Sequence, residues 1–137
     1  MLMTHEELHE LMKDSAQNAI LTTKDEFRID LDGSADSIAK VDEVILRWIE
    51  RYKDQALEDK AVFTLCNIYG AYVGEVFRSV VGGNWTYDES DPEAPYVLLE
   101  YGGHSYAFAG ICFQRLVNDS QISVQKYFEQ AIANNTQ

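Results

Sequence analysis

Three residues near the start of the chain have the types and the spacing of a zinc site. The stretch T-H-E-E-L-H-E (4–10) contains the pattern H-E-x-x-H, formed by His5, Glu6 and His9. On a helix the two imidazoles lie one turn apart and can ligate zinc, while the glutamate beside the first can act as a general base. A zinc-dependent hydrolase is therefore one alternative function for this chain.

Other features of the sequence argue against that alternative. A catalytic zinc ion needs a third protein ligand, and the longer metalloprotease pattern fails because Met12 stands where it requires glycine. The remaining histidine, His104, follows a glycine pair typical of a hairpin. We therefore expect a solvated helix face rich in histidine and glutamate, with no metal and no other cofactor.

A second stretch, G-A-Y-V-G-E (70–75), contains two glycines inside a predicted helix. Each costs about 1 kcal/mol there, so the pair needs a reason. Spaced by four, they fall on one helix face and form a flat notch. The notch can pack inside the protein, under Trp85 for example, or it can hold a small ligand or the seam of a homodimer.

Glu75 follows the notch directly and can pair with Arg78 or Arg115. Alternatively it is half-buried with a raised pKa, as a functional carboxylate would be. The sequence shows no second carboxylate or nucleophile assignable to the same place, so we expect no catalytic residues.

Charge is the most informative bulk property. The 137 residues include 11 basic and 23 acidic side chains, which gives a net charge of −12. Nucleic acid and anionic membrane surfaces are disfavoured as partners, whereas a basic protein would be attracted. The acidic stretch 88–93 lies close to several tyrosines, a combination suited to docking such a partner. The candidate binding residues are Gly70, Gly74, Glu75, Trp85, Tyr87, Asp88, Glu89, Asp91 and Tyr101.

The elements that must position these residues follow from hydrophobic periodicity. The pattern has the period of a helix in three N-terminal segments and then the period of strands. We expect helices over 4–22, 35–52, 58–80, 109–117 and 121–133, and strands over 27–31, 85–87, 96–101 and 105–107. The predicted fold class is α+β, with N-terminal helices packed on a three- to four-stranded antiparallel meander and C-terminal helices after it, in a single domain over 1–137.

Three further expectations concern the cell. No signal peptide is visible, and the apolar runs are far too short to cross a bilayer. Cys66 and Cys112 lie in apolar surroundings and are expected to be free, buried thiols. Together these features predict a cytoplasmic protein, either a monomer or a homodimer.

Three segments together resemble a family of small bacterial domains of unknown function. They are D-G-S-A-D-S-I-A-K-V-D (32–42), Y-G-A-Y-V-G-E-V (69–76) and G-G-N-W (82–85), within a similar region of about 30–117. The family has a D-x-S-x-x-S-[LI] helix start, a G-x-x-[LV]-G-E helix and a G-G-x-W turn. The resemblance implies the helix–helix–meander order and no catalytic residues.

Size and acidity of this kind are frequent among immunity proteins that neutralise toxins, which is an association of type and not a motif. We therefore predict a non-catalytic acidic protein-binding module of immunity type, with a basic partner that is plausibly a toxin. The zinc hydrolase, and a small-ligand-binding or dimerising domain, remain the alternatives.

Overall fold

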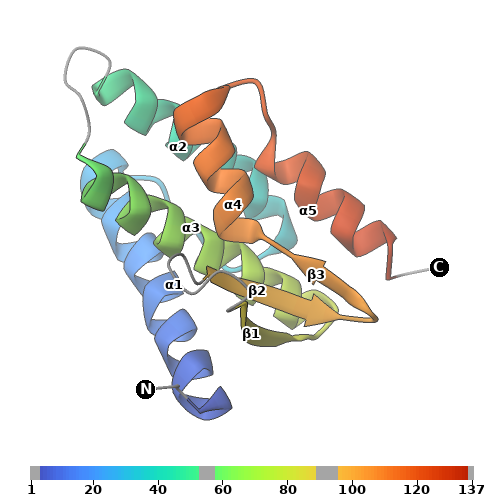
Figure 1. Cartoon of the computed structure of the whole chain (residues 1–137). Coiled ribbons are helices and arrows are strands. Elements are labelled where there is room, and N and C mark those ends of the chain that lie inside the picture. The colour runs from blue at the N-terminus through green and yellow to red at the C-terminus, as the bar shows by residue number, and fades with distance from the viewer. Residues whose placement is uncertain (1–3, 53–57, 89–95, 136–137) are drawn as a thin grey trace.

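The computed structural model describes residues 4–52, 58–88 and 96–135, and it has the predicted α+β architecture (Figure 1). The elements are α1 (His5–Phe27), η1 (Ala35–Ser37), α2 (Ile38–Arg51), α3 (Asp59–Val80), β1 (Asn84–Asp88), β2 (Tyr96–Tyr101), β3 (His104–Tyr106), α4 (Phe108–Phe113), η2 (Gln114–Asn118) and α5 (Val124–Ala133). N-terminal helices, an antiparallel sheet and C-terminal helices follow one another as expected.

Helix α1 begins where the sequence predicts and ends later. Thr4 caps it with a capping box, in which the Thr4 hydroxyl accepts from the Glu7 amide and Glu7 accepts from the Thr4 amide. The helix continues to Phe27, whose ring packs edge-on against Trp48 at 5.0 Å between centroids. Arg28 then adopts a left-handed conformation with φ 56°. The predicted strand over 27–31 is therefore wrong, because Phe27 completes the helix and Arg28 caps it.

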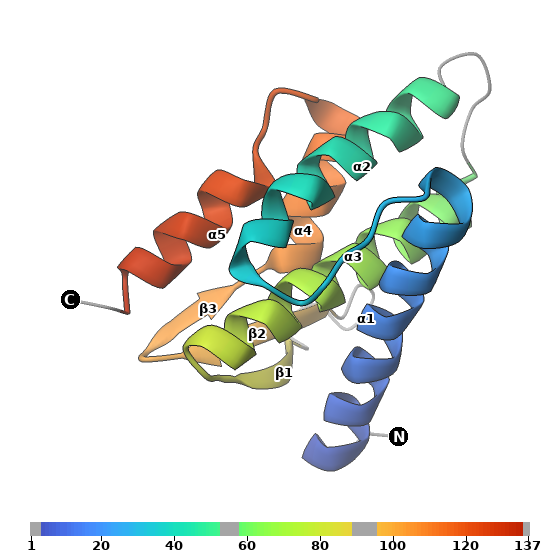
Figure 2. The same cartoon turned by 180° about the vertical axis from the view of Figure 1, so that it is seen from behind.

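Helix α3 lies at the centre of the molecule. Eleven of its residues are buried, and α1 lies beside it in both views (Figures 1 and 2). Helix α4 covers another side, and the sheet packs against the C-terminal half of α3, where Trp85 of β1 meets Gly74. The buried apolar side chains of all these elements form one contiguous cluster. Helix α3 thus carries the notch residues into the middle of the fold.

The sheet is a three-stranded antiparallel meander in the order β1-β2-β3. Its register aligns Trp85 with Leu99 and Leu99 with Tyr106, and all three side chains are buried. Gly102 and Gly103, with φ 62° and 81°, form the two-residue turn between β2 and β3, as predicted. The register turns the ring of Tyr106 inward against Phe77 and Phe108.

The C-terminal helices are fixed by a long-range contact. The guanidinium of Arg115, which is 9% exposed, donates to the carbonyls of Asp42, Ser120 and Ile122. The Asp42 carboxylate accepts from the amides of Val124 and Gln125 and so caps α5. Helix α5 therefore begins at Val124 rather than at 121, with Ser123 as its N-cap.

None of the helices in the described ranges is long and apolar enough to span a membrane.

Candidate functional site

The glycine notch on α3 is filled from within the chain. A Cβ placed on Gly74 would lie 2.0 Å from Cη2 of Trp85, and one on Gly70 would lie 2.5 Å from the backbone of Ala109. The indole ring of Trp85 and helix α4 thus occupy the space that the two glycines leave. The sequence leaves open internal packing, a small-ligand site or a homodimer seam for the notch, and the structure shows internal packing. Neither Gly70, Gly74 nor Trp85 offers a surface to a ligand or a second copy in this conformation.

Glu75 holds β1 against α3. Its carboxylate accepts a hydrogen bond of 2.9 Å from Nε1 of Trp85 and pairs with Arg78 at 2.8 Å. Arg78 also donates through Nε to the carbonyl of Gly83. Of the two predicted partners, Arg78 is therefore the correct one, whereas Arg115 pairs with Asp42. The carboxylate next to the notch has a structural task already.

The C-terminal end of α3, which carries Glu75 and Arg78, lies next to the histidines of α1. An open depression of about 670 Å³ lies between the N-terminal turns of α1, the end of α3 and the start of β1. Its lining residues are His5, Glu6, His9, Glu10, Lys13, Arg78 and Asn84. The fold thus brings the H-E-x-x-H face next to the Glu75–Arg78 pair, although more than sixty residues separate them in sequence.

A second depression of about 530 Å³ continues the first, since both are lined by His5 and Asn84. It runs over the sheet to the β2–β3 turn. Its other lining residues are Thr86, Glu100, Tyr101, Gly102, Gly103, His104 and Ser105. We call the two depressions together the histidine groove, because all three histidines of the chain line it.

The groove carries more negative than positive charge at neutral pH. Glu6, Glu10 and Glu100 stand against Lys13, while Arg78 is neutralised by Glu75. Partial burial lowers the pKa of His9 below its usual 6.5, helped by the positive charge of Arg78 and opposed by Glu75. The neutral form of this imidazole is thereby favoured.

Among the described residues, the H-E-x-x-H face offers two imidazoles as metal ligands and no third ligand beside them. His5 and His9 lie one turn apart on α1, as the pattern predicts. Across residues 4–52, 58–88 and 96–135, however, no group of three or more histidine, cysteine, aspartate or glutamate side chains is arranged to hold a metal ion. His104 lines the far part of the groove without completing such a group. The zinc-hydrolase alternative therefore gains no third ligand from this part of the chain.

The predicted aromatic and acidic surface is described only in part. Tyr87 and Tyr101 are 39% and 37% exposed, as expected. The ring of Tyr101 packs edge-on against Phe77 and lines the groove beside His104. Glu89, Asp91 and the side chain of Asp88 lie outside the described residues. Among the predicted binding residues that the structure describes, Tyr101 is the one that lines the histidine groove.

The residues of the first resembling segment have structural roles. Asp32 accepts from the amide and hydroxyl of Ser34, which lowers the pKa of its carboxyl. Ser34 caps η1, and the hydroxyl of Ser37 lies 2.5 Å from that of Tyr72. Asp42, at the end of the segment, caps α5. Sequence reasoning missed the role of Asp42, since its partners lie more than seventy residues away.

Comparison with known proteins establishes the fold alone. No family model matches the sequence, and no curated protein matches it. A chain from Bacteroides thetaiotaomicron, with a crystal structure at 1.50 Å resolution, superposes with a TM-score of 0.62 and 18% sequence identity. The match covers 90% of this chain and 43% of the Bacteroides chain, so this chain spans less than half of that protein's length. The resemblance to small bacterial domains stays a prediction.

Proposed function

We propose that this chain is a non-catalytic, acidic protein-binding module that acts by contact with a basic partner, in the manner of an immunity protein against a toxin. The histidine groove is the binding surface in this proposal. The proposed location is the cytoplasm, in keeping with the free, buried cysteines Cys66 and Cys112. Nucleic acid is disfavoured as a partner by the net charge of −12.

The charge of the groove is the observation that carries the proposal. Three of its carboxylates come from two elements, Glu6 and Glu10 from α1 and Glu100 from β2, and Lys13 is the opposing charge beside them. An arginine or lysine of a partner would find carboxylates along both depressions. The overall charge would steer such a partner from a distance and raise the association rate.

Tyr101 gives the groove an anchor for the contact that follows. Its ring is fixed by Phe77 yet 37% exposed, so it offers a partner apolar area at little entropic cost. Half-exposed aromatic rings beside charged rims are typical of the energetic centres of protein interfaces. The carboxylates would attract the partner and Tyr101 would hold it. In the bound complex this chain would cover the partner's functional site.

The tasks of the motif residues support a non-catalytic role. Glu75, the carboxylate best placed for acid–base chemistry, accepts from Trp85 and Arg78 and ties β1 to α3. Asp42 is likewise used to cap α5. Side chains that hold the fold together in this way cannot move protons for a reaction without loosening it.

The test is capture of the partner from the native host at low and moderate salt. Two triple variants carry the same net charge. The groove variant is Glu6→Gln, Glu10→Gln and Glu100→Gln. The control variant, with exposed acids on α1, α2 and α5, is Asp25→Asn, Glu50→Gln and Glu129→Gln.

Wild type and control should retain a basic protein at low salt, and the groove variant should lose it. The proposal is wrong if no basic protein is recovered at either salt, or if the two variants capture it equally well.

A further inference from the structure

We infer that Cys66 and Cys112 form a site of reversible covalent modification: peroxide converts the two thiols of the folded protein into a disulfide that joins α3 to α4. This inference is independent of the proposed function. It stands on the close approach of the two helices, on their register and on the direction of the two side chains.

The backbones of α3 and α4 touch at one point. Gly70 is the residue of α3 at this crossing, and a Cβ there would lie 2.5 Å from both the nitrogen and the Cα of Ala109. Helices ordinarily pack with their axes about 8–10 Å apart because side chains separate them. The glycine removes that separation, so residues one turn from the crossing also lie unusually close across it.

The register places the cysteines opposite each other. Helices α3 and α4 run antiparallel, since the ring of Phe77 contacts that of Phe108 while Phe63 stacks on Phe113 at 6.2 Å. Cys66 precedes the crossing by one turn and Cys112 follows Ala109 by nearly one turn. In an antiparallel pair these two positions meet. A disulfide spans Cα atoms about 4.4–6.8 Å apart, which a glycine-mediated crossing can supply.

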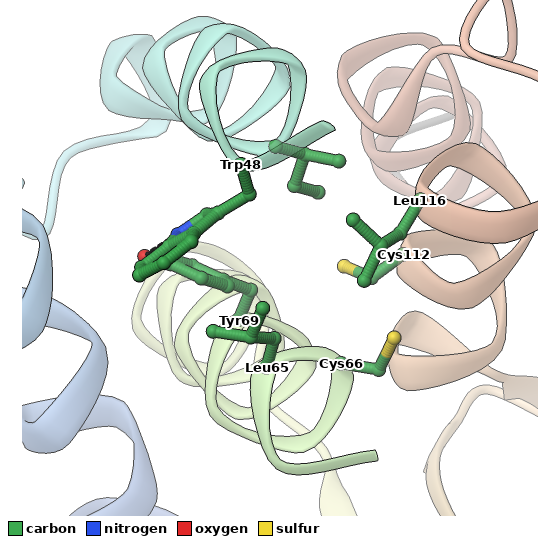
Figure 3. A pocket seen from close by; sticks show the side chains of 7 residues that line it. Trp48, Leu65, Cys66, Tyr69, Cys112 and Leu116 are labelled. Atoms are coloured by element: carbon green, nitrogen blue, oxygen red, sulfur yellow. Dashed lines mark hydrogen bonds between the residues drawn. The ribbon is translucent and has the colours of Figure 1, made fainter. Parts of the chain in front are cut away.

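The close-up in Figure 3 shows both sulfur atoms directed into the space enclosed by α2, α3 and α4. The two cysteines line one narrow void with Ile45, Trp48, Leu65, Tyr69 and Leu116. This void is too narrow for a water molecule, so it is no ligand site.

The reaction has two steps. Peroxide first oxidises Cys66, which is 4% exposed against 1% for Cys112: the sulfur bonds to one oxygen, the O–O bond breaks and water leaves, giving a sulfenic acid. The sulfur of Cys112 then attacks that of Cys66. The S–S bond forms, the S–O bond breaks, and the hydroxyl leaves as a second water with the Cys112 proton. Overall, two thiols and one hydrogen peroxide give one disulfide and two water molecules.

Burial sets the rate of this reaction. It raises the pKa of Cys66 to about 12 and that of Cys112 well above its usual value, and the nearby Cys66 raises the latter further. The thiolate is the reactive form, so the folded pair is slow to oxidise at neutral pH. The rate should rise about tenfold per pH unit between pH 7 and 9, without the plateau that an ordinary cysteine of pKa about 8.5 shows.

The experiment treats the folded chain with hydrogen peroxide and follows its intact mass, its free thiols and its tryptic peptides. The expected product is a monomer lighter by two hydrogen atoms, with both thiols lost together and one cross-linked peptide pair. The oxidised form should unfold at a higher temperature than the reduced form, and dithiothreitol should reverse the shift.

Two controls keep the outcome decisive. The Cys66→Ala and Cys112→Ala variants should show no loss of two hydrogens, and wild type unfolded in urea shows whether peroxide reaches the thiols at all. The inference is overturned by any of three results: sulfinic acid on one cysteine with the other free, linkage only between chains, or thiols that react in urea but never in the folded state. A lower unfolding temperature on oxidation would also overturn it, because the bond would then not fit the existing helix spacing.

Discussion

Replacing Gly74 by alanine tests the packing of the notch directly. Its Cβ would lie 2.0 Å from Cη2 and 2.3 Å from Cζ2 of Trp85, whereas ordinary contacts begin near 3.4 Å. The indole must therefore shift by more than an ångström, although it is 2% exposed and its Nε1 is held by Glu75. Overpacking of this kind costs about 1–3 kcal/mol and a weakened hydrogen bond to a charged group about 1.5 kcal/mol, while alanine returns about 1 kcal/mol of helix propensity. We expect a net loss of about 2.5 kcal/mol in the free energy of unfolding.

Urea unfolding of four proteins measures this loss and its cause: wild type, Gly74→Ala, Trp85→Phe and the double variant. The smaller phenyl ring relieves the contact, so Gly74→Ala should cost at least about 1.5 kcal/mol less in the Trp85→Phe background. The matched control is Gly110→Ala on α4, an exposed glycine whose Cβ would meet Ala107 at 3.3 Å. It should change stability by less than about 1 kcal/mol. An equal cost of Gly74→Ala in both backgrounds would refute the reasoning.

Three further predictions concern other sites. Arg115→Met should lower the free energy of unfolding by about 3–5 kcal/mol in urea titrations, because the partly buried Asp42 carboxylate loses its cation. Arg115→Lys, which keeps the charge but not the fork of donors, should lose less, and equal stability of all three proteins would contradict this role. Folding lowers the pKa of His9 below 6.5, so the unfolded chain binds more protons at this residue and stability should fall as pH drops below 6.5. In thermal unfolding, His9→Gln should remove part of that fall. Identical pH profiles of the two proteins would contradict this prediction. Untagged protein should contain far less than one zinc ion per chain by metal analysis, since His5 and His9 lack a third ligand in the described residues; stoichiometric zinc would favour the hydrolase instead.

Local signals predicted most of the elements. The glycine pair at 102–103 acts through its immediate neighbours, and the helical glycines at 70 and 74 meet a steric need that glycine alone can meet. The packing of the notch under Trp85 was therefore among the interpretations open from sequence. The sequence pattern thus indicates that another group packs closely against these glycines, and the structure identifies that group as the ring of Trp85 and the backbone of Ala109.

The misses share a physical cause. Phe27, Ile29 and Leu31 alternate as a strand would, yet contact with Trp48 keeps Phe27 in the helix. The start of α5 is decided by Asp42, which no pattern near residue 120 can reveal. In each case a tertiary contact overrides a local preference.

The candidate site was less accessible to sequence reasoning than the fold. The H-E-x-x-H stretch and the Gly70–Glu75 stretch are both visible in the sequence, but neither indicates that His9 and Arg78 lie around one depression. Only the packing of α1 beside α3 brings them together. The net charge of −12 favours a basic partner whatever the fold, and that partner stays a prediction.

The association rate of the captured partner tests the central claim most directly. The claim is that carboxylates of the histidine groove attract and dock a basic protein, with no bond made or broken. Stopped-flow measurements should give an association rate constant that falls about tenfold or more from low to moderate salt. The groove variant should associate slowly at both salts, while the control variant follows wild type. A rate that does not depend on salt, or that the two variants lower equally, would contradict the account.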